Sequence, residues 1–212
     1  MTRVLAFCCA LLTCAAVFAA DPDEFSYCTV CHGVDGNGNP AIKAPKIAGL
    51  APWYVEAQLN AFRAGWRGTD PADAPGHEMR PVATALPNEA ALARAVAYVA
   101  NFPSIPPPVT IEGDAARGAT LYAACAACHG AAGEGNESLG APALAGQNDW
   151  YLATQIRNYR DGRRGTHPDD ARGATMRPFV AALVDDAVIA DLVAYVRFVT
   201  LQGNLPTKEI DP

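Results

Sequence analysis

The chain has 212 residues, enough for one large domain or for two small ones of roughly 100 residues each. Its formal net charge of −6 argues against nucleic-acid binding, which needs a basic surface, and favours solubility and a partner with a basic docking surface. Half of the residues are hydrophobic but only 8% are aromatic, and glycine and proline are common. This composition indicates small helical domains whose long loops wrap around a cofactor.

Residues 1–20 are predicted to be a secretory signal peptide. Arg3 precedes an apolar run that ends in Ala19 and Ala20, small residues typical of a cleavage site, before the acidic Asp21. The run is also near the minimum length that spans a bilayer, so an uncleaved membrane anchor is the alternative. Cleavage is the preferred interpretation because the positive flank is weak and the run ends in alanines.

A first unit is predicted over residues 21–102, and it begins with the motif Cys28-Thr29-Val30-Cys31-His32. This spacing is the attachment pattern of a c-type haem. Each thiol adds to one vinyl group of the porphyrin, and the adjacent imidazole becomes a ligand of the iron. A redox dithiol or half of a zinc site would show the same residues, so one copy alone does not decide between them.

Two helices are expected later in the first unit, over residues 53–62 and 88–99. Both segments place apolar residues at helical spacing, and Asn88 is a suitable N-cap for the second. Residues 68–81 lie between them and are rich in Gly, Pro and Asp. They are predicted to form a long ordered loop, which contains Met79.

Residues 103–111 are predicted to be a proline-rich linker. Its prolines make it extended and fairly stiff, so it restricts the angles between the two units. The second unit is predicted over 112–203, with a helix over 114–124, a final helix over 185–199 and a loose tail over 204–212.

The haem motif returns as Cys125-Ala126-Ala127-Cys128-His129, displaced by 97 positions. Seven cysteines are present and three lie in the first twenty residues, so 7 − 3 = 4 remain, all of them in the two motifs. No thiol is left for a disulfide or a nucleophile, and zinc at either motif would lack a fourth ligand of obvious spacing. Two covalently bound haem c groups are therefore predicted, attached through Cys28, Cys31, Cys125 and Cys128.

An internal repeat of 97 residues organises the chain. It extends beyond the haem motifs to Trp53-Tyr54 with Trp150-Tyr151, Gln58 with Gln155, Arg63 with Arg160, Arg67-Gly68-Thr69 with Arg164-Gly165-Thr166, and Met79-Arg80-Pro81 with Met176-Arg177-Pro178. Such agreement without a gap indicates duplication of one fold. Only about seven residues precede the first motif after the signal peptide, so the leading helix of the first unit is expected to be cut short.

His32 and His129 are predicted to be the proximal iron ligands. Met79 and Met176 are the only methionines besides the initiator, and each lies 47 residues after its histidine (79 − 32 and 176 − 129). They are the candidate sixth ligands. Ligation by His and Met fills both axial positions and raises the reduction potential, which favours outer-sphere transfer of single electrons over catalysis.

His77 and His167 are rival ligands, but they do not occupy matching repeat positions and are expected on the surface. A guanidinium matches a carboxylate, and an indole is a donor with an apolar body, so repeated Arg and Trp residues suit haem propionates or the haem edge. These candidates are Arg63, Arg160, Trp53 and Trp150, with Arg67 and Arg164 considered second. The alternative places the tryptophans in the core and the arginines in solvent, and Tyr54 and Tyr151 are expected in the core.

The chain resembles a dihaem class I c-type cytochrome of the cytochrome c-four type. The resemblance covers the whole mature chain and rests on two CxxCHG motifs, two Ala-Pro-x-(Ile/Leu)-Ala-Gly motifs and a late methionine before a C-terminal helix. It implies an all-α fold of two tandem cytochrome c domains. It also implies that the carbonyls of Pro45 and Pro142 accept hydrogen bonds from the proximal imidazoles, and that the propionates of the two haems face each other.

The resemblance predicts a periplasmic electron-transfer protein. Such a protein shuttles single electrons from a quinol-oxidising complex or a dehydrogenase to a terminal oxidase or reductase. The alternative is a tightly bound dihaem subunit of a periplasmic dehydrogenase. Through such a partner, the chain could also be associated with the membrane. A dihaem peroxidase or thiosulfate-oxidising enzyme is a third possibility, and the matching methionines and the lack of spare cysteines argue against it.

Overall fold

The computed structural model describes residues 24–203, so the predicted signal peptide and tail lie outside the described residues. This part of the chain is helical and contains no β-strand, only two isolated bridges. The helices are α1 (Tyr27–His32), α2 (Pro52–Arg63), α3 (Ala74–Thr84), α4 (Glu89–Ala100), α5 (Ala115–His129), α6 (Asp149–Arg160), α7 (Ala171–Val180) and α8 (Asp186–Gly203). Short 3₁₀ turns, Pro40–Ile42 and Glu137–Leu139, follow α1 and α5.

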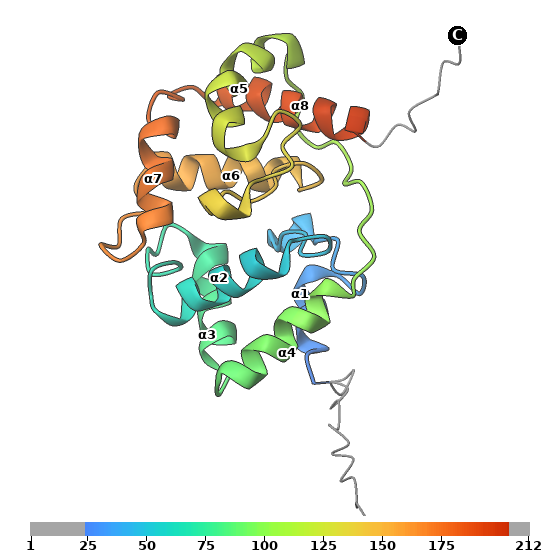
Figure 1. The fold of residues 1–212 in the computed structure, drawn as a ribbon, viewed down its shortest axis with the longest axis vertical. Coiled ribbons are helices and arrows are strands. Elements are labelled where there is room, and N and C mark those ends of the chain that lie inside the picture. The colour runs from blue at the N-terminus through green and yellow to red at the C-terminus, as the bar shows by residue number, and fades with distance from the viewer. Residues whose placement is uncertain (1–23, 204–212) are drawn as a thin grey trace, which may run out of the picture.

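The helices form two halves with the same order of elements, α1–α4 and α5–α8 (Figure 1). The chain crosses between them along one edge of the molecule, and α2 and α6 lie at the middle, where the halves meet. The all-α prediction with two tandem domains is confirmed. The helices expected over 53–62, 88–99 and 185–199 are present, and the one expected over 114–124 continues to His129. The boundaries at residues 102 and 112 stay predictions.

The leading helix differs between the halves, as the repeat predicts. In the second half α5 has 15 residues, and its N-cap Asp114 accepts hydrogen bonds from the backbone N–H groups of Ala116 and Arg117. In the first half α1 has six residues and begins after Ser26, which makes no side-chain cap bond. A helix this short depends on its packing for stability, because isolated short helices are marginal in water.

The segment around Met79 corrects the sequence prediction, because it is the helix α3 rather than a loop. Asp73 caps this helix by accepting from the N–H of Gly76. Pro75 lies in the first turn, where a missing N–H costs nothing, and Pro81 lies in the last turn. The prolines and aspartate therefore mark the two ends of the helix. Its counterpart α7 has Asp170 as its cap, Met176 within it and Pro178 in its last turn, but Arg172 in place of the first-turn proline.

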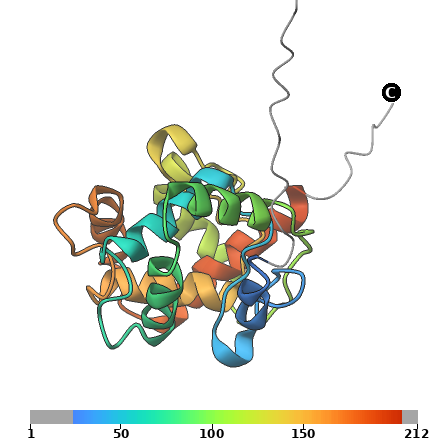
Figure 2. The ribbon, with the colours of Figure 1, turned by 90° about the horizontal axis from the view of Figure 1, so that it is seen from below.

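Each half has its own apolar core. In the first half Phe25 packs beside Leu92 of α4. In the second half Tyr122 of α5 packs beside Leu192 and Val196 of α8, and α5 and α8 lie against each other in both views (Figures 1 and 2). Two separate cores fit the duplication of one fold. No helix among residues 24–203 is long and apolar enough to cross a membrane.

Hydrogen bonds hold the linker in place at both ends. Near its start, the amide of Asn37 donates to the carbonyl of Pro103 (3.0 Å) and accepts from the N–H of Ile105 (3.2 Å). At its end, the buried carboxylate of Asp149 accepts from the N–H groups of Thr110 (2.7 Å) and Ile111 (2.9 Å). Burial raises the pKa of Asp149, but these hydrogen bonds outweigh it, so the net pKa is lowered and the carboxylate stays charged.

The contact between α5 and α8 leads to a prediction about Gly118. A Cβ at this position would overlap the backbone carbonyl of Asp191, so the two helices approach too closely there for any side chain. Gly118→Ala is therefore expected to lower the free energy of unfolding of the second domain by about 1–3 kcal/mol. Alanine has the higher helix propensity, so propensity alone predicts the opposite sign.

Urea unfolding monitored by circular dichroism measures this change. Thr120→Ala is the control, because Thr120 is exposed on the same helix and its truncation is expected to change stability by less than about 0.5 kcal/mol. A Gly118→Ala protein as stable as the wild type would contradict the packing argument.

Candidate functional site

The two candidate proximal histidines have matching environments. His32 ends α1 and His129 ends α5, and their side chains are buried. Nδ1 of His32 lies 2.6 Å from the carbonyl oxygen of Pro45, and Nδ1 of His129 lies 2.7 Å from that of Pro142. A carbonyl can only accept, so Nδ1 carries the proton and Nε2 keeps its lone pair for a metal.

Burial keeps both imidazoles neutral. It lowers the pKa of His32 and of His129, and the hydrogen bond to the proline carbonyl opposes it only in part. A neutral ring with its proton on Nδ1 is the form that ligates iron through Nε2. The carbonyl contacts that the resemblance implies for Pro45 and Pro142 are therefore present in the structure.

The four motif cysteines are free thiols on the same helices. Cys28, Cys31 and His32 are spaced i, i+3 and i+4, which places them on one face of α1. Burial raises the pKa of Cys28 to about 11 and also raises that of Cys125, so these two thiols are protonated at neutral pH. No group of three or more His, Cys, Asp or Glu side chains within residues 24–203 is arranged to hold a metal ion. The spacing of the two cysteines on one helical face fits two thioether links to one haem.

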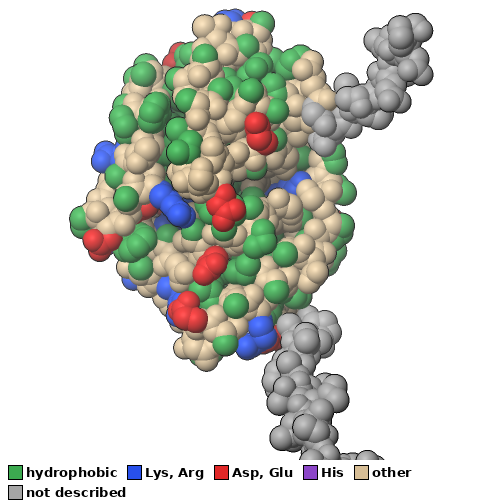
Figure 3. All heavy atoms as spheres, in the orientation of Figure 1, with side chains coloured by type: hydrophobic (Ala, Val, Ile, Leu, Met, Phe, Trp, Pro, Cys, Tyr) green, Lys and Arg blue, Asp and Glu red, His purple; other side chains and the backbone are tan. Residues whose placement is uncertain are grey.

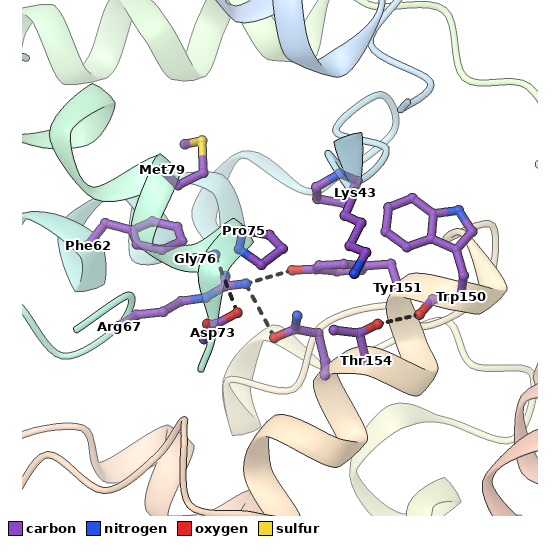
Figure 4. A pocket seen from close by; sticks show the side chains of 12 residues that line it. Lys43, Phe62, Arg67, Asp73, Pro75, Gly76, Met79, Trp150, Tyr151 and Thr154 are labelled. Carbon is purple, nitrogen blue, oxygen red and sulfur yellow. Dashed lines mark hydrogen bonds between the residues drawn. The ribbon is translucent and has the colours of Figure 1, made fainter. Parts of the chain in front are cut away.

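Met79 lines the same pocket as Pro45, the residue whose carbonyl accepts a hydrogen bond from His32. This pocket is lined by Pro45, Met79 and Phe62 from the first half and by Trp150 and Tyr151 from the second, among others (Figure 4). Met176 has the matching place in α7 and is likewise partly buried. The structure thus brings Met79 to the same pocket as Pro45, whose carbonyl bonds His32, and the role of Met79 as an iron ligand stays a prediction.

The rival histidines are elsewhere. His77 is exposed on α3. His167 stacks against Trp66 with ring centroids 6.1 Å apart, and it lies near Asp169. Within the described part of the chain, neither ring bonds a backbone carbonyl as the rings of His32 and His129 do.

A network of hydrogen bonds joins the two halves with approximate twofold symmetry. Arg67 donates to Gln58 of its own half (2.7 Å) and to Tyr151 (2.8 Å) and Gln155 (3.3 Å) of the other. Arg164 donates to Gln155 of its own half (2.7 Å) and to Gln58 of the other (2.6 Å). Each arginine therefore bonds one glutamine from each half, as in the interface of a symmetric dimer.

Arg67 and Arg164 are buried cations that form no ion pair within residues 24–203. Arg67 and Arg164 are 7% and 6% exposed and stack at 4.6 Å over the rings of Phe62 and Tyr159, respectively. Nε of Arg67 is buried without a hydrogen-bond partner in this part of the chain. A buried charge requires a partner. The residues therefore fit a cofactor that brings its own carboxylates, as haem does.

Arg63 and Arg160 have other partners. Arg63 forms an ion pair with Glu89 at 2.7 Å. Arg160 forms one with Asp161 at 2.8 Å and donates to the carbonyl of Leu183 at 3.1 Å. Their guanidinium groups are already engaged with protein acceptors, and their predicted contact with propionates stays untested.

Both candidate tryptophans lie where the halves meet. Trp53 lies beneath the guanidinium of Arg172 from the second half, 5.7 Å from the ring centroid. Trp150 lines the pocket of Figure 4 together with Pro75 of the first half. Pro75 is the repeat counterpart of Arg172, so the two indoles occupy matching positions with different covers.

Sequence reasoning missed several residues of this interface. Tyr151, expected in the core, is partly buried, and its hydroxyl accepts from Arg67 of the other half, a contact that the sequence did not indicate. Gln58 and Gln155 were recognised only as repeat matches, and that matching was the available evidence. Conserving a polar residue in both copies indicates a shared contact, whereas Lys46 and Asn148 differ from their counterparts and gave no such indication.

Comparisons with known proteins agree with this geometry. The cytochrome c family profile matches residues 15–102 and 115–200. A thiosulfate dehydrogenase electron acceptor from Stutzerimonas stutzeri is 37% identical over 175 residues, which cover 77% of this chain and 74% of that protein. The structure of cytochrome c4 from Pseudomonas stutzeri is similar with a TM-score of 0.62 and 29% identity, covering 83% of this chain and 95% of the other.

A second similar structure belongs to a protein that is longer than this chain. Thiosulfate dehydrogenase (TsdBA) from Marichromatium purpuratum matches with a TM-score of 0.63 and 32% identity over 80% of this chain. The match covers only 35% of that protein, so the chain corresponds to about a third of it.

The interdomain network leads to a prediction about Arg164. Lysine presents a single ammonium and cannot reach both glutamines as the forked guanidinium does. Arg164→Lys is therefore expected to leave buried acceptors unsatisfied and to lower the free energy of unfolding by about 1–3 kcal/mol. We expect calorimetry to show weaker coupling between the unfolding of the two domains.

Arg163→Lys is the matched control. Arg163 is adjacent in sequence, is more exposed, and forms an ion pair with Asp161 at 3.1 Å, so its loss is expected to cost less than about 1 kcal/mol. Equal effects of the two substitutions would contradict a specific role for Arg164.

Proposed function

The chain belongs to the cytochrome c family, with two domains and two covalently bound haem c groups, and we propose that it is a periplasmic electron carrier rather than an enzyme. The observation that supports this is the identical candidate ligand set in both repeats. Each has a buried neutral imidazole held at Nδ1 by a proline carbonyl, and a methionine 47 residues later. Bound haem would supply one-electron exchange between ferric and ferrous iron, and Met79 and Met176, as axial ligands, would leave no open position for a substrate.

The protein's own residues have separate tasks in this proposal. Cys28 and Cys31 form the thioether links of the first site, and Cys125 and Cys128 those of the second. The proline carbonyls fix the orientation of the imidazoles, and the same hydrogen bonds raise the basicity of the imidazoles. Arg67 and Arg164 neutralise propionates where the domains meet, because they are buried and have no carboxylate partner among residues 24–203.

An electron carrier needs a surface that admits more than one partner. On the face shown in Figure 3, charged side chains of both signs are scattered among uncharged and hydrophobic ones. Such a face fits transient contacts with redox proteins. The donor is a quinol-oxidising complex or a dehydrogenase and the acceptor a terminal oxidase or reductase.

The names of the relatives favour a more specific donor. The Stutzerimonas relative is named as the electron acceptor of a thiosulfate dehydrogenase, and the Marichromatium structure is itself a thiosulfate dehydrogenase. We therefore propose, as the second candidate, that this chain accepts electrons from such a dehydrogenase, either as a free partner or as a bound subunit.

Axial ligation is tested by visible spectroscopy of the exported protein. We expect two haems per chain by the pyridine haemochrome assay, low-spin iron, and the weak long-wavelength band of iron–methionine bonding. Met79→Leu and Met176→Leu are each expected to remove about half of that band and to create one open iron. A wild type with one high-spin haem that turns over peroxide would contradict the carrier proposal.

The donor is tested by mixing. Oxidised protein is combined with thiosulfate and a thiosulfate dehydrogenase, and reduction is followed by absorbance. Rapid reduction only when both are present would support the second candidate. Reduction by thiosulfate without the dehydrogenase would show that this chain is the enzyme, and no reduction in the complete mixture would exclude this donor but not the carrier function.

A further inference from the structure

One peptide group takes part in two hydrogen bonds that run in series. The group is the amide between Pro45 and Lys46. Its carbonyl accepts from Nδ1 of His32 at 2.6 Å, and its N–H donates to Oδ1 of Asn148 at 2.7 Å. Asn148 belongs to the second domain, so the chain of bonds runs from the proximal imidazole of the first haem across the domain boundary.

The side chain of Asn148 makes this bond instead of capping its own helix. It is the N-cap residue of α6, where an asparagine side chain normally accepts from an N–H of the first helical turn. Here it makes no such cap bond, and the residue is only 4% exposed. Its amide oxygen fits against Gly38, where a Cβ would lie 2.8 Å from it. The first domain therefore leaves room for this side chain.

Neighbouring contacts hold Lys46 on either side of this peptide. Nε2 of Gln147 donates to the carbonyl of Lys46 at 3.0 Å, and Nζ of the buried Lys46 donates to the linker carbonyl of Ile105 at 2.5 Å. The side chain of Asn148 therefore meets a backbone whose position is determined by the second domain and the linker together.

Among residues 24–203, the second haem site has no equivalent arrangement. The repeat counterpart of Asn148 is Ala51, which has no side-chain acceptor, and that of Lys46 is Ala143. The twofold network of Arg67 and Arg164 matches in the two repeats, but this contact does not. The two proximal ligands, which are alike within their own domains, thus differ in what lies behind the proline carbonyl.

We propose that Asn148 is a positioning residue of the second domain that lowers the reduction potential of the first haem and leaves that of the second unchanged. An acceptor on the N–H of an amide polarises it and makes its carbonyl a stronger acceptor. The Pro45 carbonyl then draws the Nδ1 proton of His32 more strongly, so the imidazole becomes a better donor and favours ferric iron. This inference rests on His32 as the proximal ligand.

The test replaces Asn148 with leucine, which has a similar size and no acceptor. Spectroelectrochemical titration of the holoprotein is expected to show a higher potential for the first haem only, with a change of up to about tenfold in its ferrous-to-ferric ratio, or about 59 mV. The Nδ1 proton of His32 should also shift in the NMR spectrum of the reduced protein. Met79→His, which changes a ligand of the first site alone, assigns the two titration steps.

Two further variants separate tuning from structure. Gln147→Leu removes a bond across the same boundary but to the next peptide, so it is expected to leave both potentials nearly unchanged. Asn148→Asp keeps an acceptor and is expected not to raise the potential. If Asn148→Leu does not fold, Asn148→Ala is measured instead, with the same expectation.

Three outcomes would overturn the proposal. One is an unchanged potential of the first haem in a folded variant without an acceptor at position 148. Another is an equal shift of both haems, which would indicate general loosening of the interface. The last is an equal effect of Gln147→Leu. A failure of the carrier proposal would appear as peroxide turnover by the wild type, whereas this proposal is judged by the difference in potential between each variant and the wild type.

Discussion

The hydrogen bond from the imidazole of each candidate proximal ligand, His32 and His129, to a proline carbonyl is the constraint around which both domains are built. It joins the end of the motif helix to a loop 13 residues later, and the loop must turn back to reach it. The turn depends on Gly36 and on its counterpart Gly133, which have positive φ values and whose carbonyls accept two N–H groups each. The geometry of the ligand therefore comes from backbone positions that few other residues could occupy.

Two kinds of contact hold the domains together, and they have different origins. The bonds among Arg67, Arg164, Gln58 and Gln155 follow the symmetry of the duplication, since each copy supplies the same residues. The bonds of Asn148 and its neighbours depend on substitutions made after the duplication. The symmetric set fits the role of joining equal units, and the asymmetric set makes them unequal.

Much of the fold was readable from the sequence because it depends on local patterns. The motif helices, the caps and the apolar stripe of α4 all follow short-range rules, and the repeat extended each of them to the second domain. The helix α3 was missed because Asp73, Pro75 and Pro81 are typical of loops when read one by one. Their positions at the two ends of the helix became visible only in the structure.

The sequence predicted some residues of the candidate site better than others. The cysteines, histidines and methionines have fixed spacing, so the sequence alone indicated them. Arg63 and Arg160 were preferred over Arg67 and Arg164, because sequence does not show which arginine is buried. That choice depends on how two domains pack, and a contact across 84 or 88 positions, such as those of Arg67, leaves no local pattern.

The twofold network has a consequence for the origin and concentration dependence of this interface. A face that presents Gln58 and Arg67 to its own copy is self-complementary, so a single ancestral domain with that face had the means to pair with itself. Fusion through a linker turns such pairing into an intramolecular event whose effective concentration is set by the length and stiffness of the linker, not by the protein concentration. An interface too weak to hold two separate molecules together in dilute solution therefore keeps its two redox centres paired at any dilution.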